Sequence, residues 1–202
     1  MSEPDGVIGT YRRHAAAFDR RRTRRLDEQA WLDRFLAQLP DGAEVLDLGC
    51  GHGEPVAAYL IEKGCRVTGV DASPPLIALC RNRFPAHDWR VGDMRAANLG
   101  RSFDGVLGWD SFFFLTYDEQ RAMFPAFRDL VHPGGALMFN AGPRHGEAMG
   151  AFEGEPLHHF SLAQEDYRAL LDANGFEVVA HQADAADASG RSPWLAKARM
   201  AG

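Results

Sequence analysis

Three glycines at alternate positions, Gly49, Gly51 and Gly53, directly follow an apolar strand-like segment at 44–48. Glycine lets the backbone turn sharply, and it lets a ligand approach without interference from a Cβ atom. An apolar helix is predicted at 56–61, after Pro55, and the free N–H groups of its first turn should face the glycine loop. Nucleotide-like ligands bind to units in which a strand, a glycine-rich loop and a helix follow one another in this order.

The spacing of the glycines indicates which ligand fits. A dinucleotide-binding loop has the pattern G-x-G-x-x-G, whereas this loop reads G-x-G-x-G and continues with Glu54. A carboxylate at this position would repel a pyrophosphate, but it suits a cofactor with a free amino group and no phosphate. S-adenosylmethionine (AdoMet) has this chemistry. Residues 44–54 resemble motif I of the class I AdoMet-dependent methyltransferases, and the resemblance includes Asp47, two residues before the first glycine.

A second acidic position extends the resemblance. Asp71 ends a predicted strand twenty residues after Gly51, where a carboxylate can accept hydrogen bonds from ribose hydroxyls. The similarity to motif II of the family implies this role for Asp71 and places Ala72 and Ser73 beside the cofactor. The alternative is that Asp71 only shapes the turn before the helix that Ser73 caps.

A third acidic position follows the next predicted strand. The family resemblance implies that Asp93 accepts a hydrogen bond from the adenine amino group and that Met94 lies against the purine. Gly92 and Asp93 are also typical of a β-turn, which is the alternative.

The segment 103–110 is similar to the fourth strand of the family, and the last residues of such a strand face the ligand crevice. Residues 109–111 should therefore lie near the methionine part of the cofactor and the transferred methyl group. The segment around Tyr11 resembles the N-terminal helix that closes over AdoMet in members acting on small molecules, although it could simply pack on the sheet. The predicted cofactor-binding residues are Tyr11, Asp47, Gly49, Cys50, Gly51, Gly53, Glu54, Asp71, Ala72, Ser73, Asp93, Met94, Trp109, Asp110 and Ser111.

Methyl transfer requires a general base only when the acceptor is protonated. Candidates are His158 and His159, in a segment that should form a lid over the methyl group, because imidazole titrates near neutral pH. A surface or structural role is the alternative for each histidine. No metal site is expected, because the two histidines are adjacent in sequence and the cysteines form no C-x-x-C motif.

The resemblance implies a methyltransferase that acts on O or N of a small molecule. The alternatives are an AdoMet-binding protein without transfer activity, a protein or tRNA methyltransferase, and a nicotinamide-dependent oxidoreductase. The glycine spacing and Glu54 argue against the oxidoreductase. Methylation of exocyclic amines in DNA is disfavoured because the family's Asn/Asp-Pro-Pro-Tyr/Phe pattern is missing after the fourth strand. The net charge of −6 further argues against a nucleic acid partner.

Strand-like and helix-like segments alternate along the chain, which predicts an α/β fold. We expect a seven-stranded, mostly parallel, doubly wound sheet with an antiparallel last strand pair, helices on both faces and an N-terminal helical cap. Helices are predicted at 11–18 and 26–39, and from Thr116 to Val131, where Pro125 should kink or split the helix. Ser161 and Gln164 have the spacing of a capping box for a later helix. Strands are predicted at 44–48, 66–70, 89–91, 103–107, 136–140, 176–182 and 193–198.

The length of 202 residues fits a single methyltransferase domain at 1–202. Within it we distinguish a helical cap at 1–40, an AdoMet-binding core at 41–142, a lid-like insertion at 143–160, and a C-terminal helix with antiparallel strands at 161–202. No apolar run approaches the length of a membrane span, and the N-terminus lacks the pattern of a signal peptide, so a cytoplasmic protein is expected. Its three cysteines should be reduced thiols. Seven arginines between Arg12 and Arg25 form either a solvated helix face or a contact for an anion or a substrate carboxylate.

Overall fold

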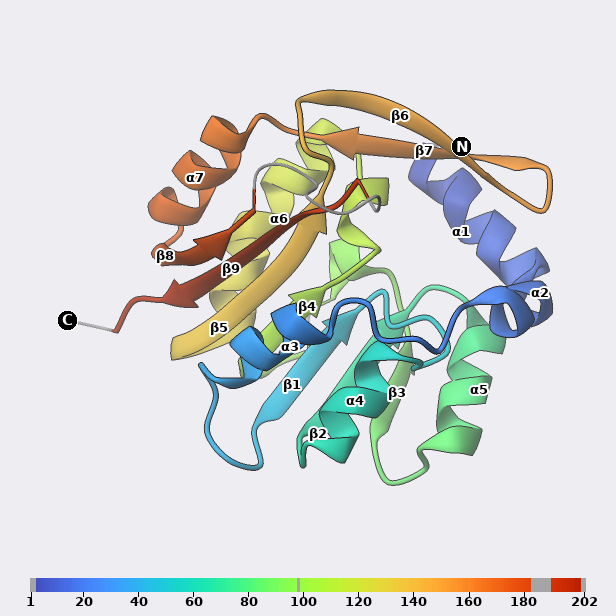
Figure 1. Cartoon of the computed structure of the whole chain (residues 1–202), viewed down its shortest axis with the longest axis horizontal. Helices are drawn as coiled ribbons and strands as arrows, with labels where there is room; N and C mark the ends of the chain where they lie inside the picture. The colour runs from blue at the N-terminus through green and yellow to red at the C-terminus, as the bar shows by residue number, and fades with distance from the viewer. Residues whose placement is uncertain (1–2, 98, 183–189, 201–202) are drawn as a thin grey trace.

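A twisted sheet of seven strands runs through the centre of the computed structural model, which describes residues 3–97, 99–182 and 190–200 (Figure 1). The order of its strands is β3-β2-β1-β4-β5-β9-β8. These strands are β1 (Glu44–Leu48), β2 (Arg66–Asp71), β3 (Asp88–Val91), β4 (Phe103–Gly108), β5 (Val131–Ala141), β8 (Phe176–His181) and β9 (Ser192–Ala198).

The strands from β1 to β5 are parallel to one another, and β9 is inserted antiparallel between β5 and β8. The two final strands therefore pair antiparallel, as the sequence predicts. Because parallel strands end at the same edge, the segments that follow β1, β2, β3 and β4 meet at one side of the sheet. The predicted sites lie in these segments.

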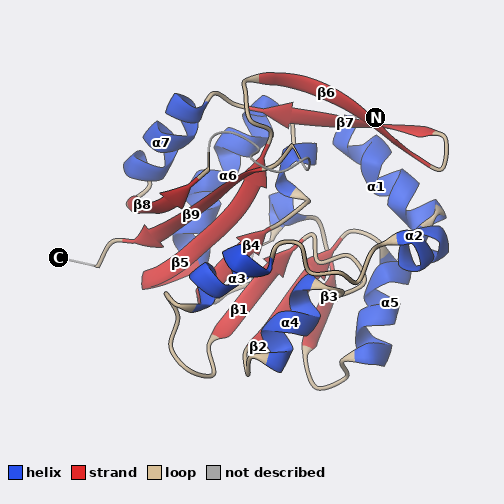
Figure 2. Cartoon of the chain, in the orientation of Figure 1, coloured by secondary structure: helices blue, strands red, loops and turns tan. Residues whose placement is uncertain are grey.

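Helices cover both faces of the sheet, which confirms the predicted fold class (Figure 2). Alternation along β1 directs Leu46 and Leu48 towards the core beneath α6 and α7, and Val45 towards the core beneath α3, α4 and α5. The helices are α3 (Gln29–Leu36), α4 (Val56–Glu62), α5 (Pro74–Arg83), α6 (Tyr117–Leu130) and α7 (Gln164–Ala173), with short 3-10 turns η1 (Met94–Ala96) and η2 (Phe112–Phe114).

Four local predictions are wrong. The helix α6 continues past Pro125 without a break, and the capping box of Thr116 and Glu119 is present at its start. Ser161 does not cap α7, because it belongs to a strand and its Oγ accepts a hydrogen bond of 2.7 Å from the amide of Gly142. The helix predicted at 26–39 is only eight residues long, and β5 begins five residues earlier than predicted, with an irregular register opposite Phe103–Gly105.

Two further elements lie outside the sheet and above its carboxyl edge. The N-terminal segment forms α1 (Glu3–Arg13) and α2 (Ala15–Arg21), divided at His14 where one continuous element is predicted. The predicted lid is an antiparallel hairpin of β6 (Gly146–Phe152) and β7 (Glu155–Ser161), which crosses the top of the molecule and reaches α1 (Figure 1). None of the helices in the described part of the chain has the length and apolar character needed to cross a bilayer.

Candidate functional site

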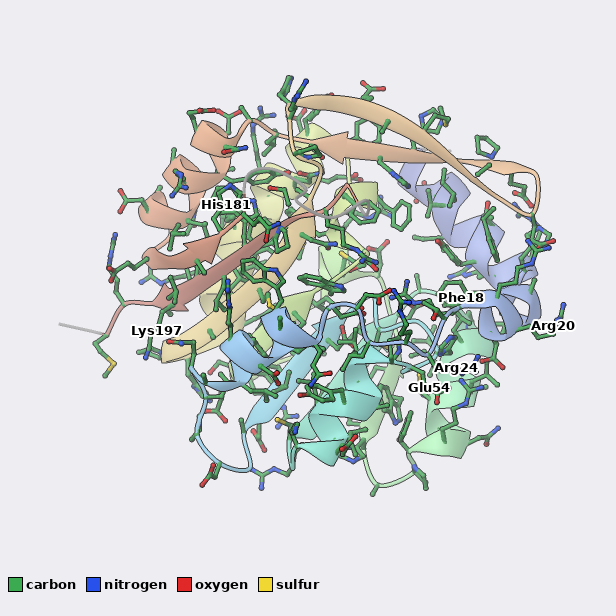
Figure 3. All side chains as sticks on the ribbon, in the orientation of Figure 1. Phe18, Arg20, Arg24, Glu54, His181 and Lys197 are labelled. Carbon is green, nitrogen blue, oxygen red and sulfur yellow. The ribbon has the colours of Figure 1, made fainter. Side chains whose placement is uncertain are left out.

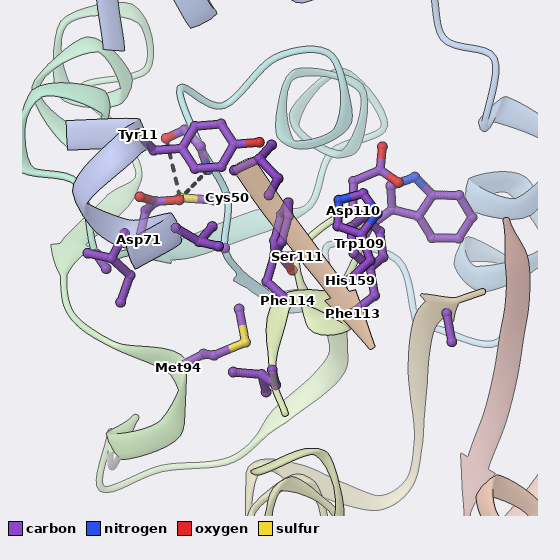
Figure 4. A pocket seen from close by; sticks show the side chains of 18 of the residues that line it. Tyr11, Cys50, Asp71, Met94, Trp109, Asp110, Ser111, Phe113, Phe114 and His159 are labelled. Atoms are coloured by element: carbon purple, nitrogen blue, oxygen red, sulfur yellow. Dashed lines mark hydrogen bonds between the residues drawn. The ribbon is translucent and has the colours of Figure 1, made fainter. Parts of the chain in front are cut away.

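A cavity of about 950 Å³ lies at the carboxyl edge of β1, β2 and β4, beneath α1 and the hairpin. Figure 4 shows Asp71 and Cys50 on one side of it and Asp110, Phe113 and His159 on the other. The cavity is large enough for more than one small ligand. Of the predicted cofactor-binding residues, those that line it are Tyr11, Asp47, Gly49, Cys50, Gly51, Glu54, Asp71, Ala72, Ser73, Asp93, Met94, Trp109, Asp110 and Ser111.

The glycine loop forms the floor of the cavity. Gly49 has a φ of 77°, and a Cβ atom there would lie 2.3 Å from the Cβ of Ser111, so only glycine fits between β1 and the end of β4. Ser111 is fixed in turn, because its hydroxyl donates a 2.7 Å hydrogen bond to the carbonyl of Leu48. Gly53 is not part of the lining, since it packs against Phe84 and Cys80 behind the loop.

Two carboxylates sit beside the glycine loop. Asp71 accepts hydrogen bonds from the amides of Gly51, at 2.9 Å, and Ser73, at 2.8 Å. Burial raises the pKa of Asp71, and these two N–H groups oppose the shift. Burial also raises the pKa of Asp47 to about 7, with a further contribution from the charge of Asp71. A positively charged ligand group near this pair would favour the ionised carboxylates.

Asp93 follows β3 and lines the cavity, next to Met94 in sequence. Its carboxylate accepts hydrogen bonds from the amide and the guanidinium of Arg95, which outweigh its burial and lower its pKa. Arg95 also pairs with Asp5 of α1 and Glu119 of α6, at 2.9 and 2.7 Å. The charged end of the cavity is thus connected to the first N-terminal helix.

Glu54 lines the cavity, but its carboxylate is already paired with Arg24 at 3.3 Å and Arg83 at 3.2 Å. Figure 3 shows Arg24 and Glu54 side by side, below Phe18. Ligand atoms of Glu54, Asp19 and His52 come within 4.8 Å of one another, a geometry that could hold a metal ion. Both carboxylates of this group are paired with arginines, because Asp19 binds Arg83 as well, so the negative charge that would attract a cation is neutralised.

The end of β4 carries a strained residue. Asp110 has a φ of 51°, which is unfavourable for a residue with a Cβ atom. Arg191 donates two hydrogen bonds to its carboxylate, at 2.8 and 2.6 Å, and Asn140 and Arg22 donate one each, at 2.7 and 3.2 Å. Burial raises the pKa of Asp110, but the hydrogen bonds and charge of Arg191 outweigh it and leave the pKa below its usual value. Sequence reasoning did not identify Arg191 or Asn140.

The roof of the cavity is held by contacts between α1 and the tip of the hairpin. The ring of Tyr11 stacks on Phe152, with centroids 5.7 Å apart, and meets the edge of Phe114 at 6.0 Å. Glu155 accepts hydrogen bonds from Thr10, Arg13 and His14. The basic segment 12–25 is largely exposed, and most of its arginines pair with acids of this chain.

The two candidate histidines point in opposite directions. Successive residues of a strand alternate between its faces, and His159 lies opposite Ala148, on the face that lines the cavity together with Leu157. His158 lies on the other face, stacks on Phe160 and is not part of the lining. The structure therefore brings His159 to the site and places His158 away from it.

His159 is half-buried beside two aromatic rings of η2. Its ring centroid lies 4.8 Å from that of Phe113 and 5.1 Å from that of Phe114. Burial lowers the pKa of His159, so the imidazole is neutral at neutral pH. Its Nε2 is buried near Gly150 of β6 and has no hydrogen-bond partner among the described residues.

A buried polar network fixes the two walls that meet at His159. The side-chain amide of Gln120 donates 2.8 Å hydrogen bonds to the carbonyls of Leu115, after η2, and Phe160, in β7. Its oxygen accepts a 2.6 Å hydrogen bond from the hydroxyl of Tyr167. Sequence reasoning missed Gln120, because a glutamine inside an amphipathic helix gives no signal of a tertiary role.

Comparison with known proteins identifies related sequences and folds. Residues 45–135 match a protein family described as "Methyltransferase domain". The chain is 31% identical over 118 residues to a magnesium-protoporphyrin O-methyltransferase of Rhodobacter capsulatus, covering 54% of this chain and 51% of the relative. It is 29% identical over 108 residues to a dTDP-3-amino-3,4,6-trideoxy-alpha-D-glucopyranose N,N-dimethyltransferase of Streptomyces venezuelae, covering 52% and 45%. The chain thus spans about half the length of these curated relatives.

The fold is shared over nearly the whole chain. The AdoMet-bound structure of CalS10, an amino pentose methyltransferase from Micromonospora echinaspora, superposes with a TM-score of 0.69 at 24% identity, and the match covers 91% of this chain and 95% of that one. At this identity the likeness establishes the fold. The family match over 45–135 includes the glycine loop, Asp71, Asp93 and the end of β4.

Proposed function

We propose that the chain is a class I AdoMet-dependent methyltransferase, which binds AdoMet in the cavity and methylates O or N of a small molecule. The observation that carries the proposal is the position of His159. The imidazole of His159 lines the same cavity as the glycine loop and Asp71, so a base and a cofactor cradle share one space.

The residues of the cavity fit AdoMet. Gly49 and Gly51 leave the loop surface open, and Asp71 is held by two amides in an orientation that leaves lone pairs for the ribose hydroxyls. Asp47 adds a second carboxylate, which suits a cofactor that carries a sulfonium and an ammonium group. Met94 supplies an apolar surface for the purine, near the carboxylate of Asp93. Glu54 contributes mainly by binding Arg24, which follows α2, and Arg83 of α5, because these two arginines occupy its carboxylate.

AdoMet supplies an electrophilic methyl group on a good leaving group, so the protein chiefly has to align the acceptor and exclude water. We assign the acceptor to the space between η2 and β7, where Phe113 and Phe114 provide apolar contacts. The imidazole of His159 accepts the proton of the acceptor's hydroxyl or ammonium group. Alignment of this kind can contribute about 7–11 kcal/mol in the best intramolecular cases.

The reaction is tested by incubating the protein with methyl-labelled AdoMet and a panel of small hydroxyl and amine acceptors, and by measuring S-adenosylhomocysteine (SAH) and the labelled product. We expect acceptor-dependent formation of SAH by the wild-type protein. The His159→Gln variant should bind SAH normally but turn over more slowly, by about 100-fold or more if proton removal limits the rate. Tight binding of SAH with no turnover across the panel would instead indicate an AdoMet-binding protein without transfer activity.

A further inference from the structure

Four arginines line the cavity, and three of them are neutralised within the chain. Arg22 and Arg191 pair with Asp110, and Arg95 pairs with Asp93 and Glu119. Arg144 has no hydrogen-bond or ion-pair partner among the residues that the structure describes. An arginine without an ion-pair partner, at the edge of a ligand cavity, is a candidate contact for a ligand anion.

The surroundings of Arg144 place it at the mouth of the acceptor end. It lies in the loop between β5 and β6 and is followed by His145, which stacks on Tyr117 with ring centroids 5.0 Å apart. Glu147, three positions further along, also lines the cavity, but it makes no ion pair with Arg144. The positive charge of Arg144 is therefore not neutralised by an ion pair among the described residues.

The distance from Arg144 to His159 is suitable for a small molecule. Ala148 lies four positions after Arg144, and an extended chain of this length spans at most about 13–14 Å. The side chain of Arg144 can reach back over part of this distance, so a molecule of one or two rings could contact both residues. The wall between them carries Phe113, Phe114 and Leu157, which favour an apolar or aromatic body.

Resting on the proposed function above, we propose that the methyl acceptor is a small molecule with an apolar, ring-containing body and an oxoanion, bound by Arg144 at the cavity mouth. The nucleophilic O or N of this molecule lies at the other end, beside the imidazole of His159. Guanidinium binds carboxylates and phosphonates through paired N–H donors, so either oxoanion fits this position. The proposal makes Arg144 a specificity-determining residue.

The proposal is tested with matched probes that differ only in charge. Binding of 4-hydroxybenzoate, 4-hydroxyphenylphosphonate and 4-hydroxybenzamide, and of 4-aminobenzoate and its amide, is measured by ligand-observed NMR with and without saturating SAH. We expect each anion to bind about tenfold more tightly than its neutral amide. The ratio between the carboxylate and the phosphonate identifies which oxoanion is preferred.

Three variants test whether Arg144 causes the preference for anionic probes. Arg144→Gln should abolish the preference for anions, and Arg144→Lys should retain part of it. Arg121→Gln removes an exposed arginine of α6 that pairs with Asp118 outside the cavity, and it should leave the preference unchanged. Equal affinity for acids and amides, no measurable binding of any acid, or an unchanged preference in Arg144→Gln would overturn the proposal. Failure to bind SAH would contradict the proposed function itself, whereas SAH binding without an anion preference contradicts only the role of Arg144.

Discussion

The carboxylate of Asp71 accepts a hydrogen bond of 2.9 Å from the amide of Gly51, and this contact joins the end of β2 to the glycine loop that follows β1. The two strands are neighbours in the sheet, with Asp47 of β1 beside Gly69 of β2. One carboxylate therefore supports the loop and faces the cavity at the same time. Its removal should affect both ligand binding and the shape of the loop.

Asp71→Ala should weaken the binding of SAH by at least tenfold, because charge-assisted hydrogen bonds contribute about 1.5–3 kcal/mol each. Calorimetric titration measures the change, and circular dichroism verifies that the variant is folded. Asp129→Ala, at an exposed position of α6 outside the cavity, is the matched control and should bind as the wild type does. Unchanged affinity in a folded Asp71→Ala variant would refute the assigned position of the ribose.

The binding of SAH should become tighter as the pH rises from 6 to 8. Burial raises the pKa of Asp47 to about 7, and an ammonium group nearby favours the ionised form, so binding releases a proton. The affinity should rise by no more than about tenfold per pH unit, the limit for a single proton. In the absence of ligand, the raised pKa of Asp47 affects the stability of the fold. The free energy of unfolding decreases as the pH increases from about 4 to 7, because the carboxyl group is harder to ionise in the folded protein than in the unfolded chain.

The Asp47→Asn variant provides the control for this linkage. It should remove the pH dependence of SAH binding and also the release of protons, which calorimetry detects in buffers of different ionisation enthalpy. If the wild-type affinity does not change between pH 6 and 8, Asp47 is not coupled to the ligand.

Turnover should depend on the neutral form of His159. Burial lowers its pKa below the usual value, with Asp110 opposing and His158 adding to the shift. The specificity constant kcat/KM should therefore fall only below about pH 6.5. Above this pH it should be constant, except for any change caused by ionisation of the acceptor. His158→Gln should preserve this profile, because His158 lies on the other face of β7. A profile that survives in His159→Gln but disappears in His158→Gln would reverse the assignment.

The ion pair between Glu155 and Arg13 should hold the roof closed. Hydrogen bonds from Arg13, His14 and Thr10 lower the pKa of Glu155 to about 2, so its charged contacts persist until the pH falls towards that value. In Glu155→Gln the amides of α1 and of the hairpin should exchange with deuterium faster, while the thermal midpoint changes little because the ion pair is partly exposed to solvent. Glu177→Gln, at an exposed position of β8, is the control. Unaltered exchange in Glu155→Gln would show that the aromatic contacts of Tyr11 and Phe152 alone hold the roof.

The parts of the site that depend on local spacing were predictable from the sequence. Gly49, Gly51 and Asp71 follow consecutive strands, and parallel pairing brings such strand ends together whatever the rest of the fold does. The polar partners of Asp110 were not predictable, because Asn140 and Arg191 are distant in sequence and meet only when β9 inserts beside β5.

The hairpin of β6 and β7 was also missed, for a different reason. The segment 146–152 is rich in small residues, so it lacks the alternation of apolar and polar residues that identifies a strand. Its pairing partner and the contacts with α1 stabilise it instead. The same effect explains the error at Ser161: its hydroxyl has the spacing of a helix cap, but β7 extends through it and Gly142 takes the hydroxyl as an acceptor.

The most direct test of the account is a crystal structure of the protein with SAH. We predict the ribose hydroxyls within hydrogen-bond distance of Asp71, the adenine beside Asp93 and Met94, and the sulfur facing the space between Phe114 and His159. SAH bound outside this cavity, or bound within it with the sulfur turned away from His159, would contradict the proposed site of methyl transfer.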